Sequence, residues 1–422
     1  MLENINRPKL FILILFVIGI ALIAFIFYLV FKTEPEELPL ENENYPTGVL
    51  PPIGPGNVNV APGGPTTLPH GTTRPGAEPT KPGTKPSAIA SGGETSARAV
   101  TKTPVKAPLA VANSTRFYNP LDGKFYEITP DGVQKSLSDD AYVNAKNITW
   151  SPNGNSAILE FPDGANIVYD FNQKKQYTLP KEMTEFSFSP TSDQIAGKFL
   201  SEENKSDNWL VAINSDGSGL QGIEPMGDNA DKVEVAWSPS SQVVALSRTG
   251  EPSGLFSQEV LLIGRNGENF KSLQVDGRGF DGRWTPKDGR LLYSVYSDRT
   301  DYLPGLWLVE ASPERVGYNK KEIGLATWVD KCTMAAGTNV AYCAVPQNLP
   351  TGAGYVRELA QGLPDVIYRV DLTNGNSSIV ASPVDDRGSG VATSNLTLSS
   401  DGKFLYFIDE ATSQLRSLQL NP

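Results

Sequence analysis

The sequence predicts an all-β fold: a β-propeller of seven four-stranded blades, preceded by one transmembrane helix and a disordered linker rich in Pro and Gly. Two observations predict the propeller. A short motif recurs at intervals of one blade, and short apolar strands separated by turn residues fill each interval. A long apolar run near the N-terminus predicts the helix. A propeller of six blades is the alternative.

The apolar run near the N-terminus predicts a helix that spans a lipid bilayer. It begins at Leu10, ends at Phe31 and contains no charged residue. About 20 such residues cross the hydrocarbon core as a helix. Because no small-residue cleavage site follows, we interpret the run as a retained signal anchor, with a cleaved signal peptide as the alternative.

The flanking charges predict the orientation of this anchor. Arg7 and Lys9 precede the run, whereas Lys32 is the one basic residue that follows it before a group of glutamates. Basic flanks favour the cytoplasmic side. Residues 1–9 are therefore expected in the cytoplasm, and the rest of the chain outside the cell membrane.

Residues 32–112 are dense in Pro, Gly and Thr and are predicted to form a disordered linker. Such a composition buries too little apolar surface to offset the entropy lost on ordering the chain. Scattered lysines and arginines leave two interpretations open, contact with an anionic cell wall or a solvated spacer. The propeller is expected to occupy residues 113–422.

The recurring motif is an aromatic or apolar residue, then Ser or Thr, then Pro or a turn residue. Its first positions, the blade anchors, are Trp150, Phe188, Trp237, Trp284, Trp328 and Leu398. Successive anchors stand 38, 49, 47, 44 and 70 positions apart, close to the roughly 40–50 residues of a propeller blade. The anchors are interpreted as structural side chains that fill the wedge between neighbouring blades.

The strands between anchors predict the blade count. Residues 148–179 form one complete unit, in which four short strands alternate with turns such as Pro-Asn-Gly. Pro fixes φ and Gly supplies a positive φ, so the hairpins close tightly. Residues 116–137 provide three strands of an earlier blade, and residues 395–420 provide three strands of a last one. This total is two strands short of seven blades and two more than six, which favours seven.

These units resemble the WD40-like (PD40) repeats of TolB-type propellers, whose hallmark after the first strand is Trp-Ser-Pro-Asp-Gly. Residues 151–154, Ser-Pro-Asn-Gly, are the nearest copy, and residues 399–402 keep the turn without Pro. The resemblance covers residues 113–420 and implies the architecture without an activity. The segment from Lys331 to Pro346 also looks like part of uncharacterised membrane-anchored propeller proteins of small-genome bacteria.

Cys332 and Cys343 are the two cysteines and stand around the predicted first hairpin of one blade. Cross-strand neighbours have Cα atoms about 4.5–5.5 Å apart, within reach of a disulfide. An extracytoplasmic location permits oxidation. A disulfide is predicted, with two buried free thiols and a functional redox pair as alternatives.

The composition excludes several kinds of chemistry. The formal net charge of −11 argues against a nucleic-acid partner. His70, the one histidine, lies in the predicted linker, so the propeller is not expected to hold a catalytic triad or a histidine-built zinc site. No catalytic residue, cofactor or metal is predicted, although calcium in the loop 228–231 is an alternative.

Loop length is the best indication of a working surface. The distance from an anchor to the third strand of its blade grows from 17 residues in the first complete unit to 38 in the unit with both cysteines. In a propeller the loops between second and third strands emerge on one face, and long loops on a rigid scaffold often carry recognition. The candidate binding residues are Phe256, Arg299, Tyr302, Tyr355 and Arg357. Variation without function is the alternative.

These features predict a membrane-anchored extracytoplasmic propeller that is not an enzyme and that binds or scaffolds an envelope protein or glycan through this loop face. A carboxylate-dependent glycosidase or lyase with a site in the central channel is the second interpretation. A structural spacer of the envelope is the third.

Overall fold

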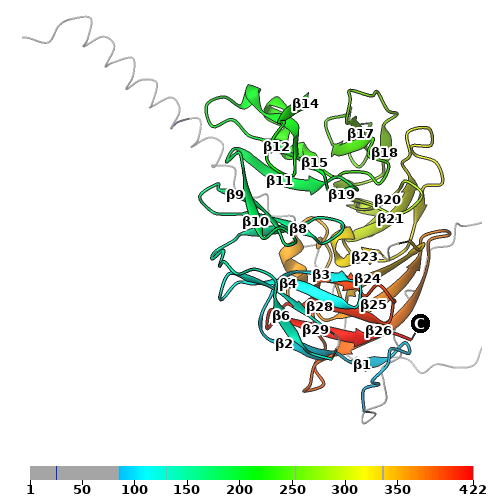
Figure 1. Cartoon of the computed structure of the whole chain (residues 1–422). Helices are drawn as coiled ribbons and strands as arrows, with labels where there is room; N and C mark the ends of the chain where they lie inside the picture. The colour runs from blue at the N-terminus through cyan, green and yellow to red at the C-terminus, as the bar shows by residue number, and fades with distance from the viewer. Residues whose placement is uncertain (1–24, 26–84, 130, 252, 335–336, 422) are drawn as a thin grey trace, which may run out of the picture. The chain divides into compact units, whose positions relative to one another are not determined.

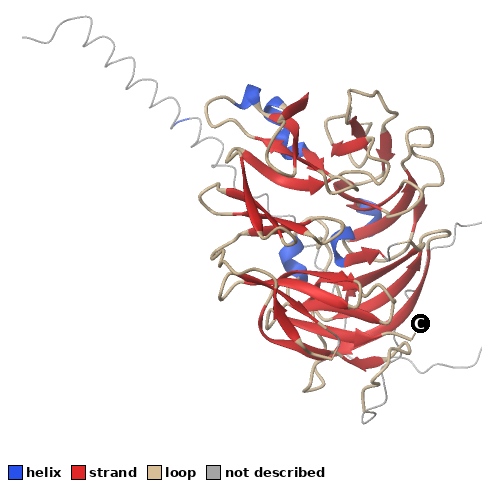
Figure 2. Cartoon of the chain, viewed as in Figure 1, coloured by secondary structure: helices blue, strands red, loops and turns tan. Residues whose placement is uncertain are grey.

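The computed structural model describes residues 25, 85–129, 131–251, 253–334 and 337–421. From residue 85 on, the chain forms seven separate β-sheets (Figure 1). Short 3-10 helices lie in loops within the blades and between them (Figure 2). The seven-bladed propeller is therefore confirmed, and the six-bladed alternative is wrong.

The predicted membrane segment lies outside the described residues, apart from Phe25, and so does the linker before residue 85. Within the described ranges, no helix has the length and apolar character needed to cross a membrane.

The first four blades contain strands that are consecutive in the chain. Blade 1 consists of β3 (Lys106–Val111), β4 (Ser114–Asn119), β5 (Lys124–Ile128) and β6 (Gln134–Ser136). Blade 2 consists of β7 (Asn147–Trp150), β8 (Ser156–Glu160), β9 (Asn166–Asp170) and β10 (Lys175–Leu179). Blade 3 consists of β11 (Met183–Phe188), β12 (Gln194–Phe199), β13 (Trp209–Asn214) and β14 (Gln221–Pro225). Blade 4 consists of β15 (Val233–Val235), β16 (Val243–Ser247), β17 (Gln258–Gly264) and β18 (Leu273–Val275).

Blade 5 also contains consecutive strands, whereas blades 6 and 7 each include a strand from the N-terminal end of the domain. Blade 5 consists of β19 (Arg278–Trp284), β20 (Arg290–Tyr296), β21 (Pro304–Glu310) and β22 (Lys321–Glu322). Blade 6 consists of β23 (Cys332–Met334), β24 (Val340–Pro346), β25 (Asp365–Asp371) and β26 (Asn376–Val384), extended by β1 (Glu94–Ser96). Blade 7 consists of β27 (Thr393–Leu398), β28 (Phe404–Asp409) and β29 (Gln414–Gln419), completed by β2 (Arg98–Pro104).

Strands β3, β7, β11, β15, β19, β23 and β27 begin the blades and line the propeller axis. Several of them contact the corresponding strand of the next blade directly, as β3 does with β27 and β7. The loops between second and third strands and the connections between blades share one end of the axis, which we call the loop face. The hairpin turns after first and third strands share the other end, the turn face.

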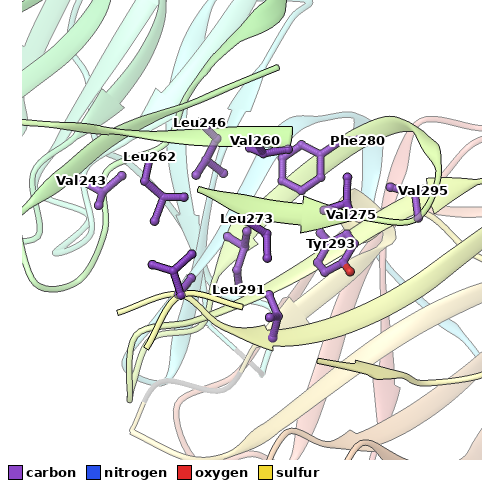
Figure 3. Close-up of a cluster of buried hydrophobic side chains, with 13 residues drawn as sticks. Val243, Leu246, Val260, Leu262, Leu273, Val275, Phe280, Leu291, Tyr293 and Val295 are labelled. Atoms are coloured by element: carbon purple, nitrogen blue, oxygen red, sulfur yellow. The ribbon is translucent and has the colours of Figure 1, made fainter. Parts of the chain in front are cut away.

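Apolar side chains pack between neighbouring sheets, because alternate residues of a strand point to opposite sides of its blade. The largest such cluster joins blades 4 and 5 (Figure 3). Leu246 on β16 and Val260 on β17 lie across from Phe280 on β19 and Tyr293 on β20. Burial of this kind, at about 25 cal/mol per Å² of apolar surface, stabilises the blade-to-blade contact.

Most predicted anchors lie at the expected place. Trp150 and Trp284 are the last residues of β7 and β19. Their indole N–H groups donate to the carbonyl oxygens of Ala107 and Ala236 in the preceding blades, at 2.7 and 3.0 Å. Each ring therefore joins two blades by a hydrogen bond as well as by packing. Phe188 and Leu398 also end their strands, and Trp237 lies two residues beyond β15.

Trp328 is different, because it does not end an inner strand. It precedes η4 (Val329–Lys331), a 3-10 turn, and β23 begins only at Cys332. The interpretation of Trp328 as a strand-ending anchor is wrong. The long interval before the next anchor arises from residues 347–364, the loop of blade 6, and residues 385–392, the connection from blade 6 to blade 7.

The predicted boundary between linker and propeller is also wrong. Residues 94–111 form β1, β2 and β3, although the sequence predicts a disordered linker up to residue 112. Figure 1 shows β2 beside β29, from opposite ends of the domain. The Thr101 hydroxyl accepts a hydrogen bond from Leu415 N at 3.1 Å, and Ala97 is fully buried. Tertiary pairing thus orders a segment whose composition alone would not fold.

The predicted disulfide is confirmed. Cys332 on β23 and Cys343 on β24 are directly opposite each other, with their Cα atoms 4.0 Å apart. Both are buried in the cluster between blades 5 and 6. The bond therefore joins the two innermost strands of blade 6 immediately after η4.

Candidate functional site

The loops of blades 4, 5 and 6 contact one another across the loop face. The rings of Phe256 and Tyr302 meet edge to face, with centroids 5.9 Å apart. Gly354 N donates to Tyr302 O at 2.7 Å, which attaches the blade 6 loop to the blade 5 loop. Tyr355, on the same blade 6 loop, meets Tyr296 edge to face at 5.9 Å. These contacts make one surface from three loops.

The structure brings together only some of the five predicted binding residues. Phe256 and Tyr302 form a pair, and Tyr355 lies on the loop bonded to them. Arg299 is exposed in η3 (Asp298–Thr300), three residues before Tyr302. Arg357 belongs to a different environment, at the mouth of the central channel.

Arg357 begins η5 (Arg357–Ala360) within the long loop of blade 6. One of its terminal nitrogens is 2.6 Å from Asp330 Oδ2. Its guanidinium lies over the indole ring of Trp328, 4.8 Å from the ring centroid. The long loop of blade 6 therefore places the Arg357 guanidinium against η4, next to the axis.

A cavity of about 280 Å³ opens at this point, which we call the channel-mouth cavity. It is lined by Trp328, Lys331, Arg357, Glu358, Ala360, Gln361 and Glu410. The turn η4 provides the inner wall and η5 the outer wall. Glu410, in the loop after β28 of blade 7, provides the remaining side. A larger cavity of about 500 Å³ beside the blade 4 loop is lined by polar residues of that loop and its neighbours.

Lys331 anchors the wall of this cavity through a buried charge network. Its ammonium donates to Asp365 Oδ2 at 3.0 Å and to Thr393 O at 2.8 Å, and lies 3.7 Å from Glu410 Oε1. Thr393 N also donates to Asp365 Oδ2, at 2.6 Å. Burial raises the pKa of the Asp365 carboxyl, and the nearby Lys331 ammonium opposes that effect. The network fixes η4 against blades 6 and 7.

Two further carboxyl groups approach each other near the axis, from neighbouring inner strands. Glu234 is on β15 and Asp281 is on β19, and each side chain changes the pKa of the other. Gly282 N also donates to the Glu234 carboxyl, at 3.2 Å. We call Glu234 and Asp281 the carboxyl pair.

A β-bulge in β19 gives Asp281 its direction. The register shifts between Arg278 and Asp281, and Gly279 within this bulge has a φ of 64°. A Cβ at this glycine would lie 2.6 Å from the Tyr296 ring, so no other residue fits without rearrangement. Bulges commonly redirect a side chain next to a functional site.

Burial and mutual repulsion change the acidity of the carboxyl pair. Desolvation, followed by the charge of Asp281, raises the pKa of Glu234 to about 8. Desolvation and then the charge of Asp330 raise the pKa of Asp281. Because two adjacent carboxylates cannot both ionise cheaply, the pair holds one proton near neutral pH.

The sequence did not single out Glu234, Asp281, Asp330 or Lys331. One signal was available: Glu234 and Asp281 each stand three positions before a blade anchor, Trp237 and Trp284. The acidic background of the chain hides such a pair, since its members come from different blades. Within the described ranges, no group of three His, Cys, Asp or Glu side chains is arranged to hold a metal ion.

No protein-family model matches the chain, and no curated protein sequence matches it. Solved structures with a similar fold include an oligogalacturonate lyase in complex with manganese, with a TM-score of 0.51 and 12% identity over 76% of this chain and 92% of that chain. A β-propeller domain of Cps50 (Swd1) from Myceliophteria thermophila has a TM-score of 0.49 and 12% identity, over 76% of this chain and 98% of that domain. A puromycin hydrolase has a TM-score of 0.48 and 14% identity, over 76% of this chain and 54% of that one. At 12% identity the likeness to the oligogalacturonate lyase shows the propeller fold alone.

Proposed function

We propose that the protein is a binding module that captures an envelope protein or glycan with the loop face of its propeller. The observation that carries this proposal is the joining of three long loops into one surface beside the channel-mouth cavity. Loops that vary without function have no reason to be bonded to one another around a cavity.

The exposed side chains of this surface are of the types that contribute most to binding. Tyr355 is 73% exposed and Tyr302 is 41% exposed, and Leu255 beside Phe256 is 78% exposed. Tyr and Arg are enriched among residues that dominate interface energies. Monomeric proteins rarely leave several large side chains exposed together.

We further propose that residues 10–31 anchor the protein in the cell membrane and that the propeller lies outside. The disulfide supports this location, because such bonds persist in oxidising compartments. Ala90 N donates to Gln419 O at 2.9 Å, at the end of β29 on the turn face. Residues 87–90 thus pack against the domain between the outer strands of blades 6 and 7, away from the loops of blades 4 and 5.

Within propellers, we propose kinship with the WD40-like (PD40) repeats of the TolB type. The hydrogen bonds of the first hairpin turns support this. Ser151 Oγ donates to Asn153 Oδ1 at 2.8 Å, and Ser399 Oγ donates to Asp401 Oδ1 at 2.7 Å. The same Ser-to-turn contact in blade 2 and in blade 7 is the structural counterpart of the Ser-Pro-Asp-Gly hallmark.

Replacement of residues 352–362 by a short Gly-Ser turn tests the binding proposal. Partner capture by the full-length protein, measured by cross-linking in envelope preparations and mass spectrometry, is expected to be lost. Replacement of residues 373–375 on the turn face is the control and should leave capture unchanged. Equal capture by both variants would contradict the assignment of the loop face and would favour a structural spacer.

The carboxyl pair supports a second candidate, an extracytoplasmic enzyme that uses carboxylates alone. A carboxyl group with a pKa of about 8 is suited to general base catalysis near neutral pH, as in a lyase that removes a proton from an acidic sugar. A glycosidase fits less well, because its two carboxyl groups stand about 5 Å or more apart to flank the bond that breaks. Release of unsaturated sugars from acidic polysaccharides by the wild type, and its loss in Glu234→Gln, would establish this candidate.

A further inference from the structure

The channel-mouth cavity contains more carboxylate than cation. Four carboxyl groups line it or bond to its walls, namely those of Asp330, Glu358, Asp365 and Glu410, against the cations of Lys331 and Arg357. An environment with this balance favours a positively charged ligand and disfavours an anionic one.

The two cations differ in how firmly they are held. The Lys331 side chain is 9% exposed and donates to Asp365 and to Thr393 O. The Arg357 side chain is 48% exposed and belongs to a loop whose neighbouring side chains also face solvent. Removal of Lys331 would leave buried carboxylates unpaired, whereas Arg357 can leave its position at little cost.

The Trp328 ring and the Asp330 carboxylate hold the Arg357 guanidinium, and we call them the Arg357 seat. This seat contains a hydrogen-bond acceptor without a partner. Arg357 bonds to Asp330 Oδ2, but the other oxygen, Oδ1, is buried and has no hydrogen-bond partner among the described residues. Oδ1 of the fully buried Asp365, behind Lys331, is likewise without a partner there. A guanidinium with both oxygens of Asp330 within reach would satisfy this acceptor, since arginine and carboxylate pair best through two parallel bonds.

We propose that this cavity binds the guanidinium of an arginine side chain from an extended segment of a partner protein, in the place that Arg357 takes in the free molecule. Arg357 is then a resident cation that the partner's arginine displaces. The Trp328 ring and the Asp330 carboxylate are the two halves of the seat, one for the flat face of the guanidinium and one for its edge. The proposal rests on the binding function of the loop face and names the chemistry of its ligand.

Arginine fits this seat better than lysine does. A guanidinium is planar, stacks on an indole ring and donates along one edge, whereas an ammonium is a compact and strongly hydrated point charge. The seat already holds a guanidinium in this geometry, that of Arg357, 4.8 Å from the centroid of the Trp328 ring. A lysine side chain is expected to bind more weakly, and an uncharged isostere not at all.

The test measures binding of three fluorescent peptides to the full-length protein in detergent by fluorescence anisotropy. Acetyl-Gly-Arg-Gly-amide carries the ligand group, the lysine peptide tests its shape, and the citrulline peptide is the neutral control. Arg357→Ala removes the resident cation. Arg315→Ala is the matched control, because Arg315 is an exposed arginine of the turn face that pairs with Glu310 and lies over the Tyr318 ring. Asp330→Asn removes the carboxylate in the Arg357→Ala background, and its thermal unfolding shows whether it folds.

Arg357→Ala is expected to tighten binding of the arginine peptide about tenfold, because the apparent affinity of a site falls with the fraction of molecules in which it is occupied internally. Arg315→Ala should leave the affinity unchanged, and Asp330→Asn should abolish binding. Equal binding of the citrulline peptide, or weaker binding after Arg357→Ala, would overturn the proposal. If no peptide binds Arg357→Ala, the arginine ligand is wrong, while capture that depends on residues 352–362 would still support the loop face.

Discussion

At the scale of single residues, the carboxyl pair is the least expected feature of the propeller. Inner strands of blades 4 and 5 place Glu234 against Asp281, a position where a neutral hydrogen-bonding side chain would stabilise the fold more. The Gly279 bulge adds a close approach to the Tyr296 ring that leaves no room for a Cβ. Local features that oppose stability are typical of functional sites.

The carboxyl pair predicts a particular dependence of stability on pH. The pKa of Glu234 is about 8 in the folded protein and about 4.3 in an unfolded chain. The folded state therefore binds the proton more tightly, and its free energy of unfolding falls as the pH rises from about 4 through 8. Glu234→Gln mimics the protonated form and does not titrate.

Thermal unfolding between pH 5 and pH 9 measures this effect. The melting temperature of Glu234→Gln is expected to match that of the wild type at pH 5 and to exceed it by roughly 1–3 °C at pH 9. Glu358→Gln, at an exposed position of the loop face, is the control, and its melting temperature should parallel that of the wild type across this pH range. Parallel curves for Glu234→Gln as well would mean that the pair does not share a proton.

At the scale of elements, the propeller is closed by N-terminal strands that pair with C-terminal ones. β2 completes blade 7 beside β29, and β3 begins blade 1. The Arg416 guanidinium also donates to Ala97 O, at 2.9 Å. Closure of this kind holds the first and last blades of the ring together.

The closure predicts where the chain can be shortened. A protein that begins at residue 85 retains β1, β2 and β3, whereas one that begins at residue 105 loses the fourth strand of blade 7. The second is expected to lose on the order of 3 kcal/mol of unfolding free energy or more, from exposed apolar surface and unpaired backbone groups. Urea unfolding of the two proteins measures the difference, and equal midpoints would contradict a stabilising role for β2.

The disulfide gives a second prediction at this scale. Serine at both Cys332 and Cys343 is expected to lower the free energy of unfolding by about 2–4 kcal/mol, because the cross-link restricts the unfolded chain. Urea unfolding of this variant against the wild type tests it. Alkylation of two free thiols in the untreated wild type, seen by intact mass, would show that the bond does not form.

The sequence predicted the blades because the anchors and turn residues repeat locally. It missed β3, although β3 pairs with the adjacent β4, because Pro and Lys interrupt its apolar pattern. It did not predict β1 and β2, because their pairing partners, β26 and β29, lie some 300 residues away. The same reason hid the site. Glu234, Asp281 and Asp330 become neighbours only when blades 4, 5 and 6 meet at the axis, whereas the long loops were visible as irregular intervals.

At the scale of the whole molecule, the two faces of the propeller have different roles. The turn face consists of short hairpin turns. The loop face has the long joined loops, the channel-mouth cavity and, on the inner strands near the axis, the carboxyl pair. A rigid scaffold with one varied face is a common arrangement for recognition.

Site-specific photo-cross-linking in intact cells tests this division of roles most directly. A photoreactive amino acid at Tyr355 on the loop face is expected to capture a defined partner, whereas the same amino acid at Asn374 on the turn face is expected to capture none. Capture of the same partner from a photoreactive amino acid at Tyr302, which lies beside this loop, should disappear in the variant lacking residues 352–362. Capture from Asn374 alone would contradict the proposal that the loop face is the binding surface.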